Sequence, residues 1–200
     1  MPVRNVENFT DAVLCLASAS PRRRELLASI GVTTTVMPAN IDETPKAGEA
    51  PDAYVVRLAH AKALAVAPHT ELPVLGSDTA VVVDDTILGK PCDEAEACAM
   101  LTRLSGRRHR VVTGVAVSGP EGVLSCCVST WVSMRAIGHD EMRAYWATGE
   151  PADKAGGYAI QGLAAVFIDH IEGSHSAVVG LPLYETAALL ARQGVALWHR

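Results

Sequence analysis

The fold is decided by one segment, Gly76-Ser77-Asp78-Thr79-Ala80-Val81-Val82-Val83-Asp84-Asp85-Thr86-Ile87-Leu88-Gly89-Lys90-Pro91. The apolar runs Val74-Leu75 and 80–83 predict buried β-strand, interrupted by a strand break at Asp78. A carboxylate inside an apolar strand is costly to bury unless another group pairs with it. Asp78 is therefore either a structural residue that caps a turn, or a metal ligand or general base. In the second interpretation, Lys90 returns beside it after a hairpin at Asp84-Asp85.

Composition limits the class of protein. Two hundred residues, 49% of them hydrophobic, fit one domain or two closely packed lobes. We expect a loosely ordered polar leader at residues 1–11 and a single catalytic domain at 12–200. The net charge of -5 argues against a large nucleic-acid-binding surface, although it allows a local cationic pocket. The chain should therefore not bind nucleic acid.

The cysteines and the hydropathy pattern indicate the compartment. The five cysteines form no CxxC pair and no zinc spacing, and their number is odd, so we expect reduced thiols in a cytoplasmic protein. No run approaches the ~20 apolar residues of a membrane span, and the N-terminal segment does not resemble a signal peptide. The sequence thus predicts no membrane association.

The first strand and helix have the pattern of an anion site. Residues 12–17 predict a buried strand, Ser20 is a suitable N-cap, and Pro21 is a suitable first helical residue. Gly31 should end this helix. Arg22 and Arg23 in the first turn oppose the helix dipole, which is explained if a polyanion binds between them. The alternative is a solvated basic helix end.

A second helix should run from Pro51 to about residue 67. The apolar stripe of this helix consists of Val55, Leu58, Ala59 and Val66. Lys62 falls on the same face, and because lysines usually extend away from a core, an inward Lys62 indicates a cleft lined with anions. Tyr54 and Arg57 lie off the stripe and are expected on the surface.

The remaining segments complete an alternating pattern. We expect strands at 33–37, 109–118, 123–134 and 164–171, and helices at 93–105, 140–148 and 182–194. A turn at 173–176 and a short buried link at 178–180 should join the last strand to the last helix. Arg107-Arg108-His109-Arg110 fits the solvated start of a strand better than a nucleic-acid patch. Segment 150–162 has no helical or strand period, and its three glycines and three charges favour a binding loop.

The charged candidates suggest one kind of chemistry. The cations are Arg22, Arg23, Lys62, Lys90 and, as a further candidate, Lys154, and the acids are Glu43 and Asp78. The sequence contains no GxxxxGK[ST], no GxGxxG and no HExxH motif. Several cations with two acids suit a site that holds a polyphosphate with a divalent metal and positions water for attack.

Together these segments closely resemble the Maf family of nucleoside triphosphate pyrophosphatases. The similarity covers residues 12–193, and its motifs are the segments 17–27, 76–91, 104–106, 150–162 and 179–183. It implies an α/β fold with an elongated mixed β-sheet flanked by helices, and two lobes around a central nucleotide-binding cleft, the Maf/ITPase-like architecture. It also implies cleavage between the α and β phosphates that depends on a divalent cation such as Mg²⁺ or Mn²⁺.

The loop Asp153-Lys154-Ala155-Gly156 to Ile160-Gln161-Gly162 resembles the subgroup that acts on dTTP and UTP. The resemblance implies Asp78 as the proton acceptor for water or as the ligand of the metal that activates it, Glu43 as its partner for metal, and Lys90 as a catalytic cation. The substrate-binding and specificity residues that it implies are Ser18, Arg22, Arg23, Lys62, Thr79 and Gln161. A broader enzyme for modified nucleotides and a nucleotide-binding regulator of septum formation remain alternatives, and a homodimer remains open.

Overall fold

The computed structural model describes residues 12–198, so the expected leader at 1–11 lies outside the described residues. The strands are β1 Leu14–Leu16, β2 Thr34–Val36, β3 Val74–Val83, β4 Thr86–Leu88, β5 Arg108–Gly119, β6 Gly122–Met134 and β7 Ile168–Glu172. The α-helices are α1 Pro21–Ser29, α2 Pro51–Val66, α3 Glu94–Leu104, α4 His139–Ala147, α5 His175–Val179 and α6 Leu183–Arg192. Short 3-10 helices are η1 Ala67–His69, η2 Glu150–Asp153, η3 Ala155–Gly157 and η4 Leu163–Phe167.

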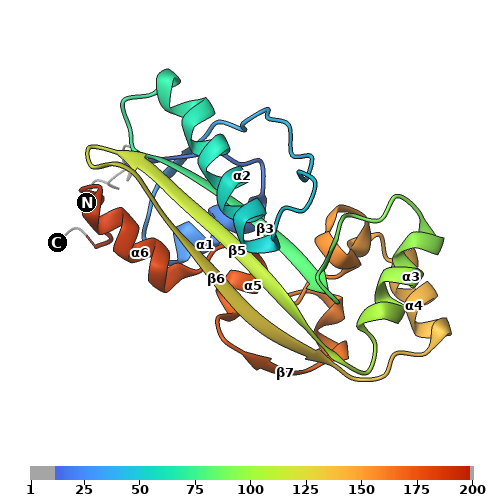
Figure 1. Ribbon diagram of the computed structural model, residues 1–200. Coiled ribbons are helices and arrows are strands. Elements are labelled where there is room, and N and C mark those ends of the chain that lie inside the picture. The colour runs from blue at the N-terminus through green and yellow to red at the C-terminus, as the bar shows by residue number, and fades with distance from the viewer. Residues whose placement is uncertain (1–11, 199–200) are drawn as a thin grey trace, which may run out of the picture.

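The described strands form one mixed seven-stranded sheet. Its order is β2-β1-β3-β5-β6-β7, with β4 paired to β3. The pairs of β1 with β2 and β3 are parallel, and the other pairs are antiparallel. The long strands β3, β5 and β6 run the length of the molecule (Figure 1). The expected α/β fold with an elongated mixed sheet is confirmed.

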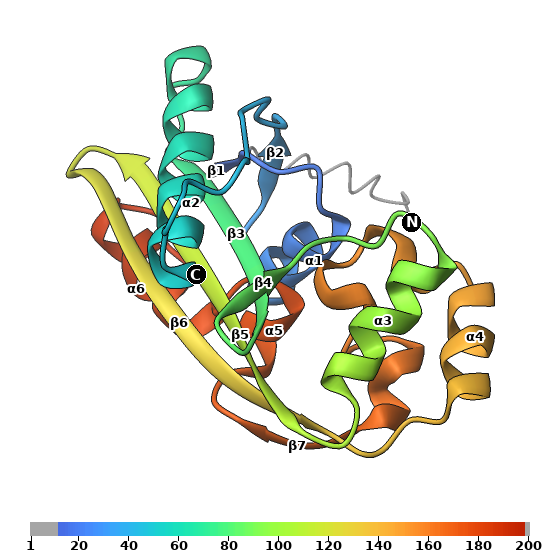
Figure 2. The same ribbon diagram turned by 45° about the vertical axis from the view of Figure 1, so that its right-hand side comes forward.

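Helices flank this sheet along its length. In both views α3 and α4 lie side by side near β7, while α2 and α6 lie toward the other end (Figures 1 and 2). One apolar cluster, with Leu101, Val132 and Phe167, fills the β7 end, and another, with Leu16 and Leu190, lies under α1 and α6. These two main cores on a shared sheet, with two smaller clusters under α2, account for the two expected lobes.

Side chains of β3 alternate between the two faces of the sheet. Gly76 faces α2, and a Cβ there would overlap the carbonyl oxygen of Ala59 and lie 2.7 Å from the Ala63 nitrogen. A Cβ at Gly114 on β5 would likewise overlap the Val55 carbonyl oxygen of α2, at 2.5 Å. Asp78 faces the helix as well, because side chains two residues apart on a strand share a face. The two glycines therefore let α2 pack close to the sheet, so that its inward side chains reach β3.

Several predicted elements are confirmed. The helices α1, α2, α3, α4 and α6 and the hairpin of β5 and β6 are where the sequence placed them. Asp84 and Asp85 form the predicted turn between β3 and β4, with φ values of 50° and 56°. All five cysteines are free, as expected. No helix within residues 12–198 combines the length and apolar character needed to cross a membrane.

Three predictions about secondary structure are wrong. β3 continues through Asp78, which pairs in register with Gly114, so no strand break exists there. The strand expected at 164–171 begins only at Ile168, because the preceding residues form η4. The turn and link expected at 173–180 are the helix α5, capped by the Ser174 side chain on the Ala177 N–H. Short apolar runs do not distinguish strand from helix, and tertiary contacts decide between them.

The basic run 107–110 spans the start of β5, but the expectation that it is solvated is wrong for His109, which is fully buried at the β7 end. Its Nε2 lies 2.7 Å from the Tyr158 hydroxyl, and its Nδ1 has no hydrogen-bond partner among the described residues. Burial, with a contribution from Arg107, lowers the pKa of His109 to about 4. The imidazole is therefore neutral at physiological pH, and the folded protein resists its protonation.

This buried histidine predicts a pH-dependent stability. As the pH falls below about 6.5, the unfolded chain binds a proton at His109 and the folded protein does not, so the free energy of unfolding falls. We expect a loss of about 3 kcal/mol between pH 6.5 and pH 4, measurable by urea denaturation. In His109→Gln, whose amide does not titrate, that part of the loss should vanish. An unchanged pH profile in the variant would contradict the assignment.

Candidate functional site

The cleft lies where β3 has no neighbouring strand on one edge. β1 pairs with β3 only at Val74 and Leu75, and β4 pairs only from Val81 onward, so the edge between them is open. A cleft of about 630 Å³ opens here. Its lining includes every site residue predicted from the sequence, namely Ser18, Arg22, Arg23, Glu43, Lys62, Asp78, Thr79, Lys90 and Gln161. The gap in strand pairing, rather than a break in β3, makes room for a ligand.

Lys62 joins the two acids on the α2 side of the cleft. Its Nζ donates to Asp78 Oδ1 at 2.6 Å and lies 2.7 Å from Glu43 Oε1. Lys62 is 7% exposed and Asp78 is 8% exposed, so this ion pair is nearly dry. The expected inward orientation of Lys62 is confirmed. Removing Lys62 would leave the buried Asp78 carboxylate without its partner, which is strongly destabilising, whereas Lys62 would keep Glu43 if Asp78 were replaced.

Tyr54 and Arg57 brace the segment that carries Glu43, and they are not simple surface residues as expected. The Tyr54 hydroxyl donates to the Glu43 carbonyl at 3.0 Å, and its side chain lines the cleft. Burial, with the charges of Asp78 and Glu43, raises the pKa of Tyr54 to about 12, so the hydroxyl remains a donor. Arg57 binds Glu49 through two nitrogens and donates to the Thr44 carbonyl. These contacts hold the acidic segment against α2.

Arg23 occupies the opposite side of the sheet edge. Its guanidinium donates to the Gly180 carbonyl at 2.9 Å, to Ser18 Oγ at 3.1 Å and to Thr79 Oγ1 at 3.4 Å. Ser77 donates to the same Gly180 carbonyl at 3.1 Å. Burial lowers the pKa of Arg23, yet a guanidinium stays charged. Arg23 is thus fixed in place as a rigid cation at the start of α1.

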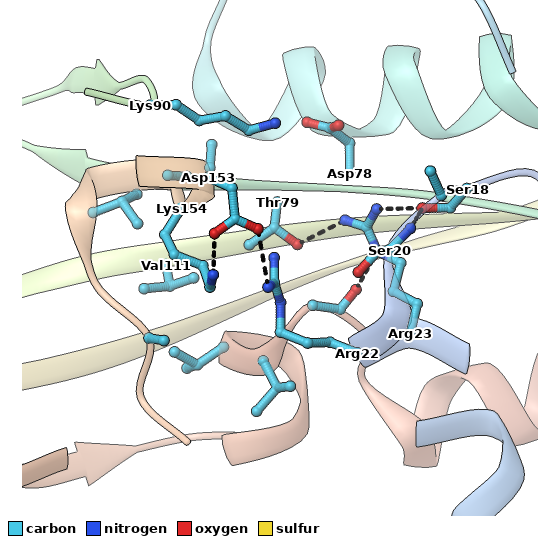
Figure 3. A pocket seen from close by; sticks show the side chains of 18 of the residues that line it. Ser18, Ser20, Arg22, Arg23, Asp78, Thr79, Lys90, Val111, Asp153 and Lys154 are labelled. Atoms are coloured by element: carbon cyan, nitrogen blue, oxygen red, sulfur yellow. Dashed lines mark hydrogen bonds and ion pairs between the residues drawn. The ribbon is translucent and has the colours of Figure 1, made fainter. Parts of the chain in front are cut away.

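Arg22 and Lys154 meet a shared acid, Asp153, across the mouth of the cleft. Arg22 Nη1 lies 3.5 Å from Asp153 Oδ2, and Lys154 Nζ binds Asp153 Oδ1 (Figure 3). The Asp153 side chain is 65% exposed, so this contact contributes little to stability. An entering anion could therefore replace the Asp153 carboxylate and form ion pairs with both Arg22 and Lys154.

Lys90 and Gln161 complete the lining from two further segments. Figure 3 shows the Lys90 amine extending toward the Asp78 carboxylate, as the sequence predicted after the β3–β4 hairpin. Gln161 lies on the loop between η3 and η4 and is exposed. No described residue hydrogen-bonds to its amide, so the amide is available to a ligand.

The two carboxylates provide a partial metal site. Within residues 12–198, no three His, Cys, Asp or Glu side chains gather as a complete metal-binding group. Glu43 and Asp78 both contact the Lys62 Nζ, and each has a second oxygen that forms no hydrogen bond within the described chain. Mg²⁺ is commonly held by one or two carboxylates with substrate phosphates and water. The donor set fits a metal that arrives with a polyphosphate.

Sequence reasoning missed three features of the site. It assigned no role to Asp153, although the residue adjoins a candidate lysine and bridges two cations. It did not foresee that the Gly180 carbonyl orients Arg23. It also assigned no role to Gly76, which makes room for α2. Only the first of these had a local signal, a charged pair in a glycine-containing loop.

Comparison with known proteins gives a consistent result. The family described as Maf-like protein matches residues 13–193. A dTTP/UTP pyrophosphatase from Pseudoalteromonas translucida (strain TAC 125) is 53% identical over 184 residues, covering 91% of this chain and 97% of that protein. Another dTTP/UTP pyrophosphatase, from Myxococcus xanthus (strain DK1622), is 54% identical over 191 residues. The match covers 95% of this chain and 97% of that protein.

A solved structure also shares the fold. A HAM1 protein from Coxiella burnetii superposes with a TM-score of 0.51 at 18% sequence identity. The match covers 90% of this chain and 98% of that protein. At this identity the similarity supports the architecture alone.

Proposed function

Because this chain belongs to the Maf family, we propose that it hydrolyses dTTP and UTP to the monophosphate and pyrophosphate. Relatives that are 53% and 54% identical over nearly the whole chain are dTTP/UTP pyrophosphatases. The observation that carries the proposal is the convergence of Arg22, Arg23, Lys62 and Lys90 on one cleft around Asp78. Among the described residues, Arg23 and Lys90 form no ion pair, and the Arg22 contact with Asp153 is largely exposed. These cations are therefore available to match the charge of a triphosphate.

Asp78 is well placed to act as the proton acceptor. Its carboxylate faces the cleft on a rigid central strand, and its bond to Lys62 fixes its orientation. In the proposed reaction, water attacks the α phosphorus, its proton passes to Asp78, and the bond from that phosphorus to the bridging oxygen breaks. The leaving pyrophosphate carries away the bond electrons.

The cations stabilise the charge that develops on the phosphates. Arg23 is held by Ser18, Thr79 and the Gly180 carbonyl, so little reorganisation is needed when the substrate binds. We propose that Glu43 and Asp78 hold a divalent cation together with the phosphate oxygens. That ion would supply Lewis acidity to the phosphoryl group.

Gln161 is the proposed base reader, assisted by Thr79 and Arg22. A glutamine amide has one acceptor oxygen and two N–H donors. Uracil and thymine present N3–H between two carbonyl oxygens, so Gln161 could accept from N3–H and donate to O4. The exposed amide at the cleft is consistent with this role.

Gln161→Glu should weaken binding of dTTP and UTP by roughly tenfold or more, because a carboxylate cannot donate to O4. The rate of hydrolysis of bound substrate should change much less, since the substitution leaves the polyphosphate side intact. KM and kcat for dTTP, UTP and CTP measure the two effects separately. A variant that keeps the wild-type preference over CTP would exclude Gln161 as the base reader.

Product identification tests the proposed function. Purified protein with dTTP should release pyrophosphate as its first product, and a chelator should stop turnover until Mg²⁺ or Mn²⁺ is restored. Orthophosphate as the first product would indicate a phosphohydrolase instead. Absence of turnover across a panel of normal and modified nucleotides would favour a binding protein.

A further inference from the structure

The loop that carries Gln161 is held by one carboxylate from outside the cleft. Glu150 begins η2, immediately after the left-handed Gly149 that ends α4. Its side chain does not line the cleft, unlike those of Asp153 and Lys154 farther along the same segment. Glu150 therefore has no direct access to a ligand in the cleft.

Glu150 accepts hydrogen bonds from the start of η4. Its Oε2 accepts from the Leu163 N–H at 3.1 Å, and its Oε1 accepts from the Ala164 N–H at 3.4 Å. The residue that precedes η4 is Gly162, which has no side chain to cap these amides. Free N–H groups at a helix start need an acceptor, and a carboxylate is a strong one. Glu150 supplies that acceptor from 13 residues away in the sequence.

The same carboxylate holds the start of the loop through Tyr145. The Tyr145 hydroxyl donates to Glu150 Oε1 at 2.7 Å and accepts from the Ala159 N–H at 3.2 Å. Burial and the hydrogen bond to Glu150 raise the pKa of Tyr145, so its hydroxyl remains a donor. Glu150 thus fixes the backbone on both sides of Gln161, directly at Leu163 and through Tyr145 at Ala159.

Gly162 is the residue that permits this arrangement. A Cβ at position 162 would overlap the Glu150 carboxylate. The φ of Gly162 is -109°, so Gly162 does not lie in the left-handed region that favours glycine. The approach of Glu150 supplies a specific reason for glycine next to the proposed base reader.

We propose that Glu150 is a positioning residue that sets the base specificity of the cleft by fixing the backbone around Gln161. This inference rests on the proposed function, and specifically on Gln161 as base reader. No described residue holds the Gln161 amide, so its position depends on the backbone on either side. A backbone that moved would let the amide shift until it also paired with cytosine, so selectivity requires that the backbone around Gln161 stay in one position.

The matched pair Glu150→Gln and Glu141→Gln tests the proposal. Glu141 also accepts a backbone N–H at a helix start, from Gly138 at 3.0 Å, but its other hydrogen bonds are to Arg135 and none reaches the loop that carries Gln161. In Glu150→Gln one acceptor oxygen becomes an NH₂ that faces N–H or O–H donors. The preference for dTTP over CTP should fall by about tenfold through KM, with kcat little changed. Glu141→Gln should keep the wild-type preference.

A second variant and a second measurement separate a specific loss of base preference from general misfolding. Tyr145→Phe keeps the ring and removes the hydroxyl that joins Glu150 to Ala159, so it should lower the same preference. Hydrogen exchange should show faster exchange at the Ala159, Leu163 and Ala164 amides in Glu150→Gln, with unchanged exchange in the β3 and β5 core.

The outcomes are distinguishable. Loss of dTTP preference with faster exchange at the three amides supports the proposal. A folded Glu150→Gln that retains the wild-type preference overturns it, and so does an equal loss in Glu141→Gln. A wild-type protein that hydrolyses neither dTTP nor UTP refutes the proposed function itself, whatever the variants do.

Discussion

Asp78→Asn is expected to remove nearly all turnover and to leave a folded protein that still binds nucleotide. The amide keeps the shape of the carboxylate, and its oxygen can still accept from Lys62, which also keeps Glu43 as a partner. It loses the basicity needed to take a proton from water and weakens the proposed metal site. General bases contribute ~10²–10⁴-fold, and the lost metal ligand adds to that effect.

The matched control is Asp84→Asn, at the turn after the same strand. Asp84 is exposed, has a φ of 50° that asparagine tolerates, and forms a surface ion pair with Arg107. This variant should keep activity close to wild type. Steady-state release of pyrophosphate, circular dichroism and calorimetric binding of dTTP compare the two variants. Near-normal turnover in Asp78→Asn would remove Asp78 from the catalytic role.

Gly76→Ala should produce the largest loss of stability among single-methyl additions in the cleft region. The added Cβ would overlap the Ala59 carbonyl, and because the obstacle is helix backbone, no side-chain rotation relieves it. Overpacking in a core costs ~1–3 kcal/mol and sometimes more, so we expect at least about 3 kcal/mol. Displacement of α2 away from the sheet should also separate Lys62 from Asp78 and reduce turnover.

Gly89→Ala provides the control for this prediction. A Cβ at Gly89 meets no atom within 4 Å, and its φ lies outside the left-handed region. Its free energy of unfolding should stay within about 0.5 kcal/mol of wild type. Urea denaturation measures the free energy of unfolding of both variants. Equal stabilities would show that α2 can shift without cost, contrary to the packing described above.

Local sequence patterns predicted many of the elements because their signals lie within a few residues. Pro21 and Gly31 correctly bounded α1, and the Asp84-Asp85 turn correctly joined β3 to β4. The inward position of Lys62 followed from the 3.6-residue period of α2. These features depend on backbone dihedral preferences and on one apolar helix face, and residues close together in the sequence determine both.

The local patterns failed where an element depends on distant partners. Asp78 interrupts an apolar run, which suggested a strand break, yet hydrogen bonds to β5 carry the strand through it. The start of η4 is likewise stabilised by Glu150, 13 residues earlier, and no residue beside it indicates this. Strand pairing and capping at a distance override local propensity.

The sequence by itself thus determined which residues carry charge, which face of α2 turns inward, and where most chain reversals occur. Only the tertiary structure decided that Lys62 joins Asp78 to Glu43, and that Arg23 is fixed by the Gly180 carbonyl 157 residues away. The open edge of β3 arises because β1 and β4 pair with different parts of it. Such long-range contacts form only when distant segments pack together, and that packing is set by the two cores rather than by neighbouring residues.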